Sequence, residues 1–132
     1  MSKTYLFVYG TLMSNHRANS YLINEKYIGR ATTKDNKFSM VSCGGAYPMV
    51  FNNGDKKIAG EIYEIDSNII RYLDIYEGCD NSRNALYKRD YFDYVLEDGT
   101  EVKAIMYYQN NNLHHNFYMA NVLLENDTYR WR

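Results

Sequence analysis

The sequence predicts a single domain in which strands joined by hairpins form a sheet and one amphipathic helix packs against it. No repeat, low-complexity tract or Pro/Gly/Ser-rich linker divides the 132 residues. Runs of β-branched and aromatic residues alternate with turn residues along much of the chain. One segment places its apolar residues at helical spacing. We therefore expect one domain over residues 1–132, with 113–132 as a variable C-terminal tail.

The first half of the chain is expected to be mostly strands. Thr4–Tyr9 is almost continuously apolar, which indicates a strand buried on both faces. After the loop at Gly10, Ser14 can cap a short helix over Asn15–Ile23. Turn residues, including Asp35-Asn36 and Asn52-Asn53-Gly54, separate three further expected strands. These strands are Tyr27–Thr33, Lys37–Ser42 and Lys57–Ile65.

The amphipathic helix follows the last of these strands. Asp66 or Ser67 can cap its first turn, and Gly78 supplies a residue suited to ending it. Its apolar stripe consists of Ile69, Ile70 and Leu73. The stripe predicts that one side of the helix packs on the sheet.

The second half contains the clearest hairpin signal. Tyr87–Leu96 and Val102–Tyr108 read as two strands joined across Asp98-Gly99, a dipeptide that accepts the positive φ angles of a type I′ turn. Beyond an asparagine-rich loop, one more helix is expected around Phe117–Leu124.

Composition and charge exclude several classes of protein. The formal net charge of -1 gives no overall field favouring nucleic acid or anionic lipid. No apolar run is long enough to span a membrane, and the N-terminus lacks the features of a secretory signal. We therefore expect a cytoplasmic protein, with Cys43 and Cys79 as thiols rather than a disulfide. No apolar heptad or extra amphipathic face is present, so we expect a monomer.

Glu77 is a candidate acid/base. At about 100° per residue it falls between Ile70 and Leu73 on the helical wheel, inside the apolar stripe. Desolvation there would raise the pKa of the carboxyl, and the negative end of the helix dipole would act in the same direction. A carboxyl with a pKa near neutrality can both accept and return a proton. The alternative is that the helix frays at Tyr76 and Glu77 turns outward to solvent.

Gly10 ends the first strand and is a candidate binding element. Without a Cβ, a ligand can approach the main chain there, and successive loop amides can converge on an anion or a developing oxyanion. A helix that begins just afterwards would direct its N-terminus to the same place. The alternative is an ordinary tight turn.

Short motifs along the chain occur in the order found in the γ-glutamylcyclotransferase-like family. They are FVYGTL (7–12), YPMV (47–50), GEIYEID (60–66), LDIYEG (73–78), and YKR (87–89) followed by AIMYY (104–108). Each is short, but their order makes a strong signal. The chain therefore resembles this family, particularly its γ-glutamylamine cyclotransferase or AIG2-like branch with its small bacterial relatives. The resemblance covers residues 5–108.

The resemblance implies a compact α+β fold, with a mixed, barrel-like β-sheet, a few short helices and a cavity near the first strand. It also implies that Tyr9, Gly10, Thr11 and Leu12 form the loop that holds the γ-glutamyl group. The chain departs from the family where Asn15 stands in place of a frequent glycine. This departure puts the part of the pocket shaped by that passage in doubt.

The resemblance further implies that Glu77 is the catalytic acid/base and that Tyr87 and Tyr107 lie near the pocket. In such enzymes the substrate's α-amine attacks its own γ-carbonyl, which releases 5-oxoproline and an amine. The nucleophile is intramolecular, so orientation supplies much of the acceleration, and we expect neither metal nor cofactor. The expected partner is a small γ-glutamyl compound whose leaving group the sequence does not specify.

Three other activities are less consistent with the sequence than γ-glutamyl cyclotransferase activity. A cysteine enzyme would use Cys79 with His16 or His114 as base, but no recognisable nucleophile context surrounds that cysteine. A zinc site is disfavoured because His114 and His115 are adjacent, so their side chains diverge. RNA binding would use the YKRDYFDY segment (87–94), but its aspartates interrupt the positive charge.

The last alternative is a non-catalytic small-molecule-binding module of the same fold, because fold alone does not fix function. Retention of both the loop and the acid favours catalysis. A binding module would not need a carboxylate where charge is costly.

Overall fold

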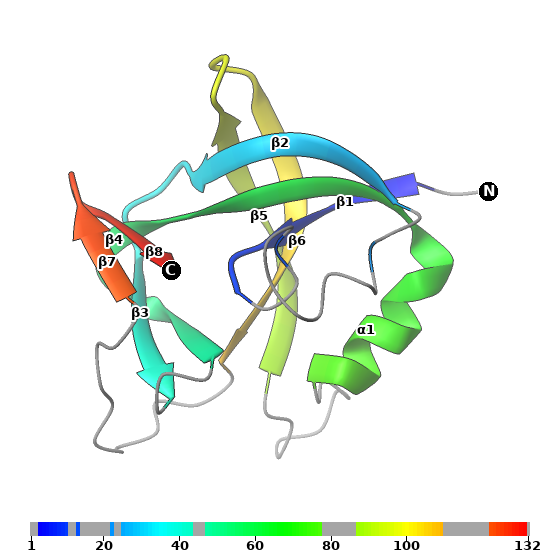
Figure 1. Cartoon of the computed structure of the whole chain (residues 1–132), viewed down its shortest axis with the longest axis horizontal. Helices are drawn as coiled ribbons and strands as arrows, with labels where there is room; N and C mark the ends of the chain where they lie inside the picture. Colours follow the sequence, from blue (N-terminus) through cyan, green and yellow to red (C-terminus); the bar gives the residue numbers. More distant parts are fainter. Residues whose placement is uncertain are drawn as a thin grey trace.

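The computed structural model describes residues 3–10, 13, 22, 25–43, 47–77, 87–109 and 122–131. Within these residues strands dominate, with short 3₁₀ turns and one α-helix (Figure 1). The elements in chain order are β1 (Lys3–Val8), β2 (Lys26–Thr33), β3 (Phe38–Cys43), β4 (Tyr47–Asp66), η2 (Ser67–Ile69), α1 (Ile70–Glu77), β5 (Tyr87–Leu96), β6 (Glu101–Gln109), β7 (Val122–Glu125) and β8 (Thr128–Trp131). No helix in the described ranges has the length and apolarity needed to cross a membrane.

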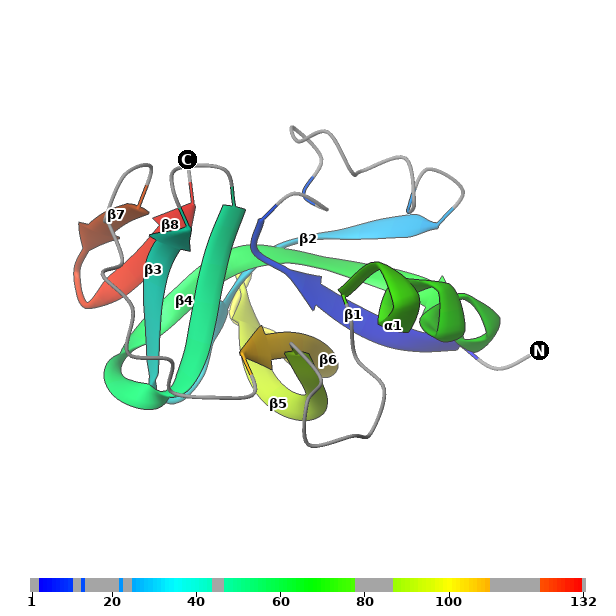
Figure 2. The same cartoon turned by 90° about the horizontal axis from the view of Figure 1, so that it is seen from below.

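Five strands close a ring of pairings, β1-β6-β5-β2-β4 and back to β1. The β1–β6 pair is parallel, whereas β4 pairs antiparallel with both β1 and β2. The first half of β4 lies outside this ring and pairs antiparallel with β3. The middle of β4 pairs in parallel with β8. Figure 2 shows β3, β7 and β8 at one end of the molecule and α1 at the other, beside β1. The predicted α+β class with a mixed sheet is confirmed.

The core forms between the strands of the ring, and β1 runs through it. Leu6, Phe7 and Val8 are all buried, as the apolar run in the first strand predicts for burial on both faces, whereas Tyr5 nearer the start of the strand is 36% exposed. The Phe7 ring stacks on Tyr94 of β5 at a centroid distance of 4.3 Å. The end of β1 is therefore packed on both faces of the strand.

The strand β4 is longer than predicted. It begins at Tyr47 rather than at Lys57, and the expected turn at Asn52-Asn53-Gly54 lies inside it. Ser39 pairs with Phe51 and its neighbour Phe38 pairs with Lys56, so four residues of β4 bulge out of the ladder. The turn residues thus interrupt the pairing with β3 without ending the strand.

The start of α1 agrees with the prediction. The side chain of Asp66 accepts a hydrogen bond from the Asn68 amide at 2.9 Å, and the first turn is 3₁₀. Leu73 is buried, and Ile69 and Ile70 are half-buried against the core. The predicted apolar stripe therefore does face the sheet.

The β5–β6 hairpin lies where predicted, but its turn type differs. The non-glycine residues with positive φ in the described part of the chain are Asn126 and Asp127, so Asp98 does not take the type I′ conformation. Instead the Gly99 amide donates to the Leu96 carbonyl, Gly99 has a φ of 89°, and the Leu96 amide donates to the Thr100 carbonyl. This is a three-residue loop with a glycine bulge, because only the last loop residue needs positive φ.

The C-terminal segment corrects the prediction of a helix around Phe117–Leu124. Its described part from Val122 is a strand, and β7 and β8 form a hairpin around Asn126 and Asp127. Both turn residues have positive φ, 52° and 61°, as a two-residue type I′ loop requires. Pairing within the hairpin therefore outweighs the helical pattern.

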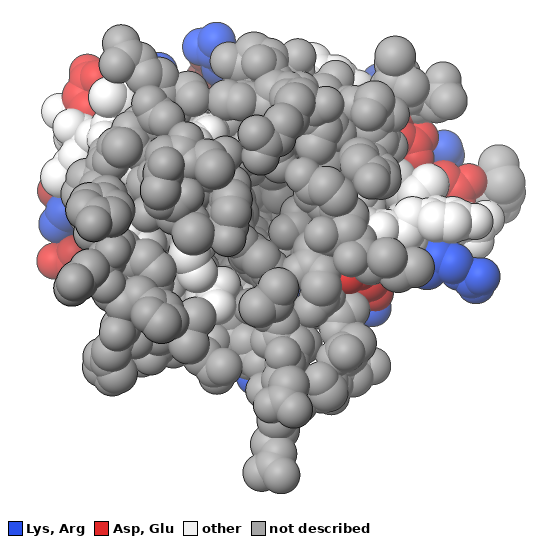
Figure 3. All heavy atoms as spheres, turned by 60° about the horizontal axis from the view of Figure 1, so that its bottom comes forward, with Lys and Arg blue, Asp and Glu red and all other residues white. Residues whose placement is uncertain are grey.

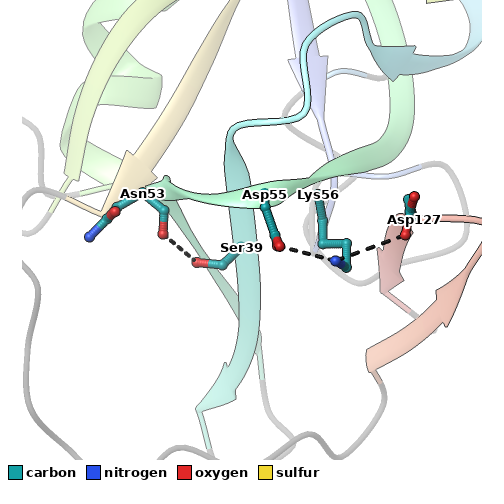
Figure 4. A network of polar contacts seen from close by, with 5 residues as sticks. All are labelled: Ser39, Asn53, Asp55, Lys56 and Asp127. Atoms are coloured by element: carbon teal, nitrogen blue, oxygen red, sulfur yellow. Dashed lines mark hydrogen bonds and ion pairs between the residues drawn. The ribbon is translucent and has the colours of Figure 1, made fainter.

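This hairpin is attached to β4. The Lys57 amide donates to the Asp127 carbonyl at 2.8 Å, and the Lys56 ammonium contacts the carboxylates of Asp55 and Asp127. Figure 4 shows this contact beside the Ser39–Asn53 hydrogen bond of the bulge. Trp131 of β8 is buried in the core. The described end of the chain is thus part of the folded domain.

Candidate active site

The end of β1, the end of β6 and the start of β5 meet at one edge of the sheet. Parallel pairing of β1 with β6 brings their C-terminal ends together. Antiparallel pairing then sets Tyr87 opposite Gln109 and Arg89 opposite Tyr107. The Tyr9 hydroxyl donates to the Tyr107 carbonyl at 2.6 Å, and both side chains are buried. The sheet therefore brings together predicted site residues that lie almost 100 positions apart.

The helix α1 is tied to this edge through Asp74. The Tyr107 hydroxyl donates to Asp74 Oδ1 at 2.6 Å, and Arg89 Nε donates to the same oxygen at 2.9 Å. The Tyr107 hydroxyl also lies 3.5 Å from the Ile70 carbonyl. One carboxylate oxygen thus joins α1 to both strands of the hairpin.

Glu77 is the last residue of α1, three positions after Asp74. Its side chain lies outside the described part of the structure, so the direction of its carboxyl stays a prediction. The backbone of Tyr87 begins β5, and its side chain is likewise outside the description. Thr11 and Leu12 of the predicted loop also fall outside the described residues.

Gly10 has a packing reason to be glycine. A Cβ on this residue would lie 2.6 Å from Cγ and 2.8 Å from Cδ of Pro48, too close for any side chain. The Gly10 carbonyl accepts a hydrogen bond from the Met13 amide at 2.9 Å, which closes a turn after β1. Contact with Pro48 of the YPMV motif therefore explains this glycine without a ligand. The predicted role of the loop amides in binding stays untested.

Charged side chains of the described residues, including those of the β5–β6 hairpin, are mixed in sign. On the face drawn in Figure 3, acidic and basic side chains of the described residues lie beside one another. Within β5, Asp90 accepts a hydrogen bond from the Tyr108 hydroxyl, and Asp93 lies 3.7 Å from Lys103. In the described ranges no group of three or more His, Cys, Asp or Glu residues could hold a metal ion. The residues invoked for the cysteine-enzyme and zinc-site alternatives lie outside those ranges, namely His16, Cys79, His114 and His115.

Sequence reasoning missed the polar network around Tyr107. Asp74 precedes Glu77 by three residues in the helix, but its partners come from strands distant in sequence. Arg89 belongs to the YKR motif, but the resemblance implies no role for it. The sequence signal that could bring Arg89 and Tyr107 together is the predicted β5–β6 hairpin. The register of that hairpin depends on its turn type, which the sequence predicted wrongly.

Comparison with known families gives a match over most of the chain. The family model described as "Gamma-glutamyl cyclotransferase, AIG2-like" matches residues 6–130. The match therefore extends beyond the motifs recognised in the sequence and includes the β7–β8 hairpin.

Individual relatives carry related names. A Methanocaldococcus jannaschii protein, provisionally named a gamma-glutamylcyclotransferase, is 35% identical over 107 residues, covering 79% of this chain and 82% of that protein. Rat gamma-glutamylaminecyclotransferase is 33% identical over 83 residues, or 57% of this chain. The matched segment spans 55% of the rat enzyme.

The fold is also found in a solved structure. The crystal structure of an aig2-like protein from mouse superposes with a TM-score of 0.72 and covers 86% of this chain and 82% of the mouse chain. The two sequences are 24% identical in this comparison, so the likeness concerns the fold.

Proposed function

Because the chain belongs to the AIG2-like gamma-glutamyl cyclotransferase family, we propose that it is an enzyme that converts a γ-glutamyl amide into 5-oxoproline and a free amine, with Glu77 as general acid/base. The family and the names of its relatives support γ-glutamyl cyclotransferase activity in general. The specific reaction, its product and the role of Glu77 go beyond these names and are what we propose.

In the proposed reaction the substrate is its own nucleophile. The α-amine nitrogen attacks the γ-carbonyl carbon, and a five-membered ring closes through a tetrahedral oxyanion. The bond from that carbon to the leaving nitrogen then breaks. Glu77 accepts a proton from the attacking amine and delivers one to the leaving nitrogen, so the enzyme ends in its starting state. Holding the substrate in the ring-closing geometry supplies much of the acceleration.

The observation that carries the proposal is the convergence at one sheet edge. Tyr107 links the end of β1 to the helix that ends in Glu77: its carbonyl accepts a hydrogen bond from the Tyr9 hydroxyl, and its own hydroxyl donates to Asp74. In this arrangement the loop amides after β1 would bind the glutamyl carboxylate or the oxyanion. Tyr87 begins the strand opposite the end of β6, so its position fits a place beside the pocket.

A direct assay tests the proposal. The purified protein is incubated with γ-glutamyl-lysine, a γ-glutamyl amino acid and glutathione, and 5-oxoproline is measured by mass spectrometry. We expect turnover of at least one of these compounds, and a fall of about 10²-fold or more in Glu77→Gln because the general acid/base is lost. Glu97→Gln, in the exposed β5–β6 turn, makes the same chemical change away from the site and should keep full activity.

Two outcomes would contradict the proposal. Unchanged cyclisation by Glu77→Gln would remove this residue from the mechanism. Binding of γ-glutamyl compounds without any 5-oxoproline would instead identify a non-catalytic module of the same fold.

A further inference from the structure

We propose that Asp74 is a positioning residue, whose carboxylate fixes the last turn of α1 against β5 and β6 and thereby sets where Glu77 acts. The inference rests on the proposed function of Glu77. It concerns the hydrogen bonds that Asp74 makes and not a contact of Asp74 with substrate.

The geometry around the Asp74 carboxylate supports a positioning role. Two donors from different strands, Tyr107 Oη at 2.6 Å and Arg89 Nε at 2.9 Å, converge on Asp74 Oδ1. These two residues face each other across the β5–β6 ladder. A single helical residue is therefore held by a cross-strand pair, which fixes it in two directions. Hydrogen bonds to a charged group are among the stronger polar contacts in proteins, and Asp74 is only partly exposed, with 21% of its side chain accessible.

The residue that anchors Asp74 is itself buried and hydrogen-bonded. Tyr107 is 4% exposed, and its carbonyl accepts the hydrogen bond from the buried Tyr9 hydroxyl. The chain of contacts thus runs from the end of β1, through β6, to α1. It connects the predicted γ-glutamyl loop to the helix that carries the predicted acid/base.

Asp74 and Glu77 lie close together along the helix. Position 77 is three residues from Asp74 and is the last helical position. Because a helix is rigid over less than one turn, fixing the backbone at Asp74 also fixes it at Glu77. Helix ends fray readily when nothing holds them, and misplacement by about 1 Å can cost about 10²-fold in rate. The contact supplies this restraint three residues before the helix ends.

The neighbouring residue pair provides a matched control. Tyr108 and Asp90 also form a hydroxyl-to-carboxylate hydrogen bond, but both residues lie on the β5–β6 hairpin and Asp90 is exposed. This pair does not include a residue of α1. Asp90→Asn therefore repeats the chemistry of Asp74→Asn without touching the proposed restraint.

The test combines kinetics with hydrogen exchange. In Asp74→Asn we expect kcat to fall about tenfold or more, KM to change by less than about twofold, since binding energy is retained, and exchange to accelerate at the amides of residues 74–77. Asp74→Asn removes the charge but keeps an oxygen that can accept, whereas Tyr107→Phe removes the hydrogen bond and keeps the charge. Tyr107→Phe also covers the case in which Asp74→Asn folds poorly. The double variant should lose no more kcat than the larger of the two single losses, because Asp74→Asn already weakens the Tyr107 hydrogen bond that Tyr107→Phe removes. Asp90→Asn should match the wild type in every measurement.

The outcomes separate this inference from the proposed function. Wild-type kcat and wild-type exchange in both Asp74→Asn and Tyr107→Phe would overturn the positioning role. Losses equal to those of Asp90→Asn would overturn it as well, because they would reflect the hairpin alone. Full activity of Glu77→Gln would overturn the proposed function and with it the kinetic role of Asp74, whereas the exchange measurement would still report whether the restraint on α1 exists.

Discussion

Replacing Tyr94 by Phe should stabilise the protein, although Tyr94 lies in the centre of the core. Its side chain is 0% exposed, and its hydroxyl has no hydrogen-bond partner among the described residues. A buried polar group without a partner costs about 1–3 kcal/mol. Phenylalanine removes this group and keeps the ring that stacks on Phe7.

The expected gain is about 1 kcal/mol at neutral pH. The released desolvation cost lies at about 1–3 kcal/mol, and the space vacated by one oxygen takes back a few tenths of a kcal/mol. For a domain of this size, about 1 kcal/mol corresponds to an increase in Tm of about 4 °C.

The gain should grow at alkaline pH. Burial raises the pKa of Tyr94 well above 10.0, the value in the unfolded chain. Below pH 10 both states keep the proton, so this linkage costs nothing. As the pH rises above 10, the unfolded phenol ionises while the folded one does not, and the wild type loses stability. Tyr94→Phe lacks this loss.

Urea unfolding followed by circular dichroism at pH 7 and pH 10.5 measures both effects. Tyr9→Phe is the matched control, because its buried hydroxyl donates a hydrogen bond at 2.6 Å and its removal should cost about 1 kcal/mol. The same chemical change should therefore have opposite signs at the two positions. A Tyr94→Phe protein less stable than the wild type would refute the reasoning and reveal a partner for the hydroxyl.

Two further predictions concern the turns. Gly10→Ala should lower the free energy of unfolding by about 1–3 kcal/mol because the new methyl overlaps the Pro48 ring; thermal unfolding measures this, and no loss would show that Pro48 can move. Asn126→Ala should cost about 1 kcal/mol because alanine is strained at a φ of 52°, whereas Asn126→Gly should be tolerated; equal Tm values for the two variants would contradict the type I′ assignment.

Local features of the fold were predictable from the sequence. The first strand, the Asp66 cap and the apolar stripe of α1 were predicted from patterns of residues close in the chain. The cap and the stripe are confirmed, and the first strand is buried over its later part, Leu6 to Val8, but not at Tyr5. The family was also recognisable, because short motifs in a fixed order survive without knowledge of the contacts between them. The convergence of Tyr9 with Tyr107 followed only once those motifs were placed on a common sheet.

The register of the β5–β6 hairpin was decided by the tertiary structure. A two-residue loop of Asp98 and Gly99 would have set Glu97 opposite Thr100 and, counting outward, Arg89 opposite Tyr108. The three-residue loop sets Arg89 opposite Tyr107 instead. A shift of one residue moves side chains to the other face of a sheet, so the turn determines which tyrosine shares Asp74 with Arg89.

The pairing of the C-terminal hairpin was likewise decided by the tertiary structure. The spacing of apolar residues near Leu124 suits a helix, and nothing local reveals that β4 offers a free edge for β8. The sequence by itself therefore determined the elements whose stability comes from their own capping and burial pattern, together with the family. Only the tertiary structure decided which strands pair, in which register, and hence that Asp74 joins the helix to the sheet, because those contacts depend on residues far apart in the chain.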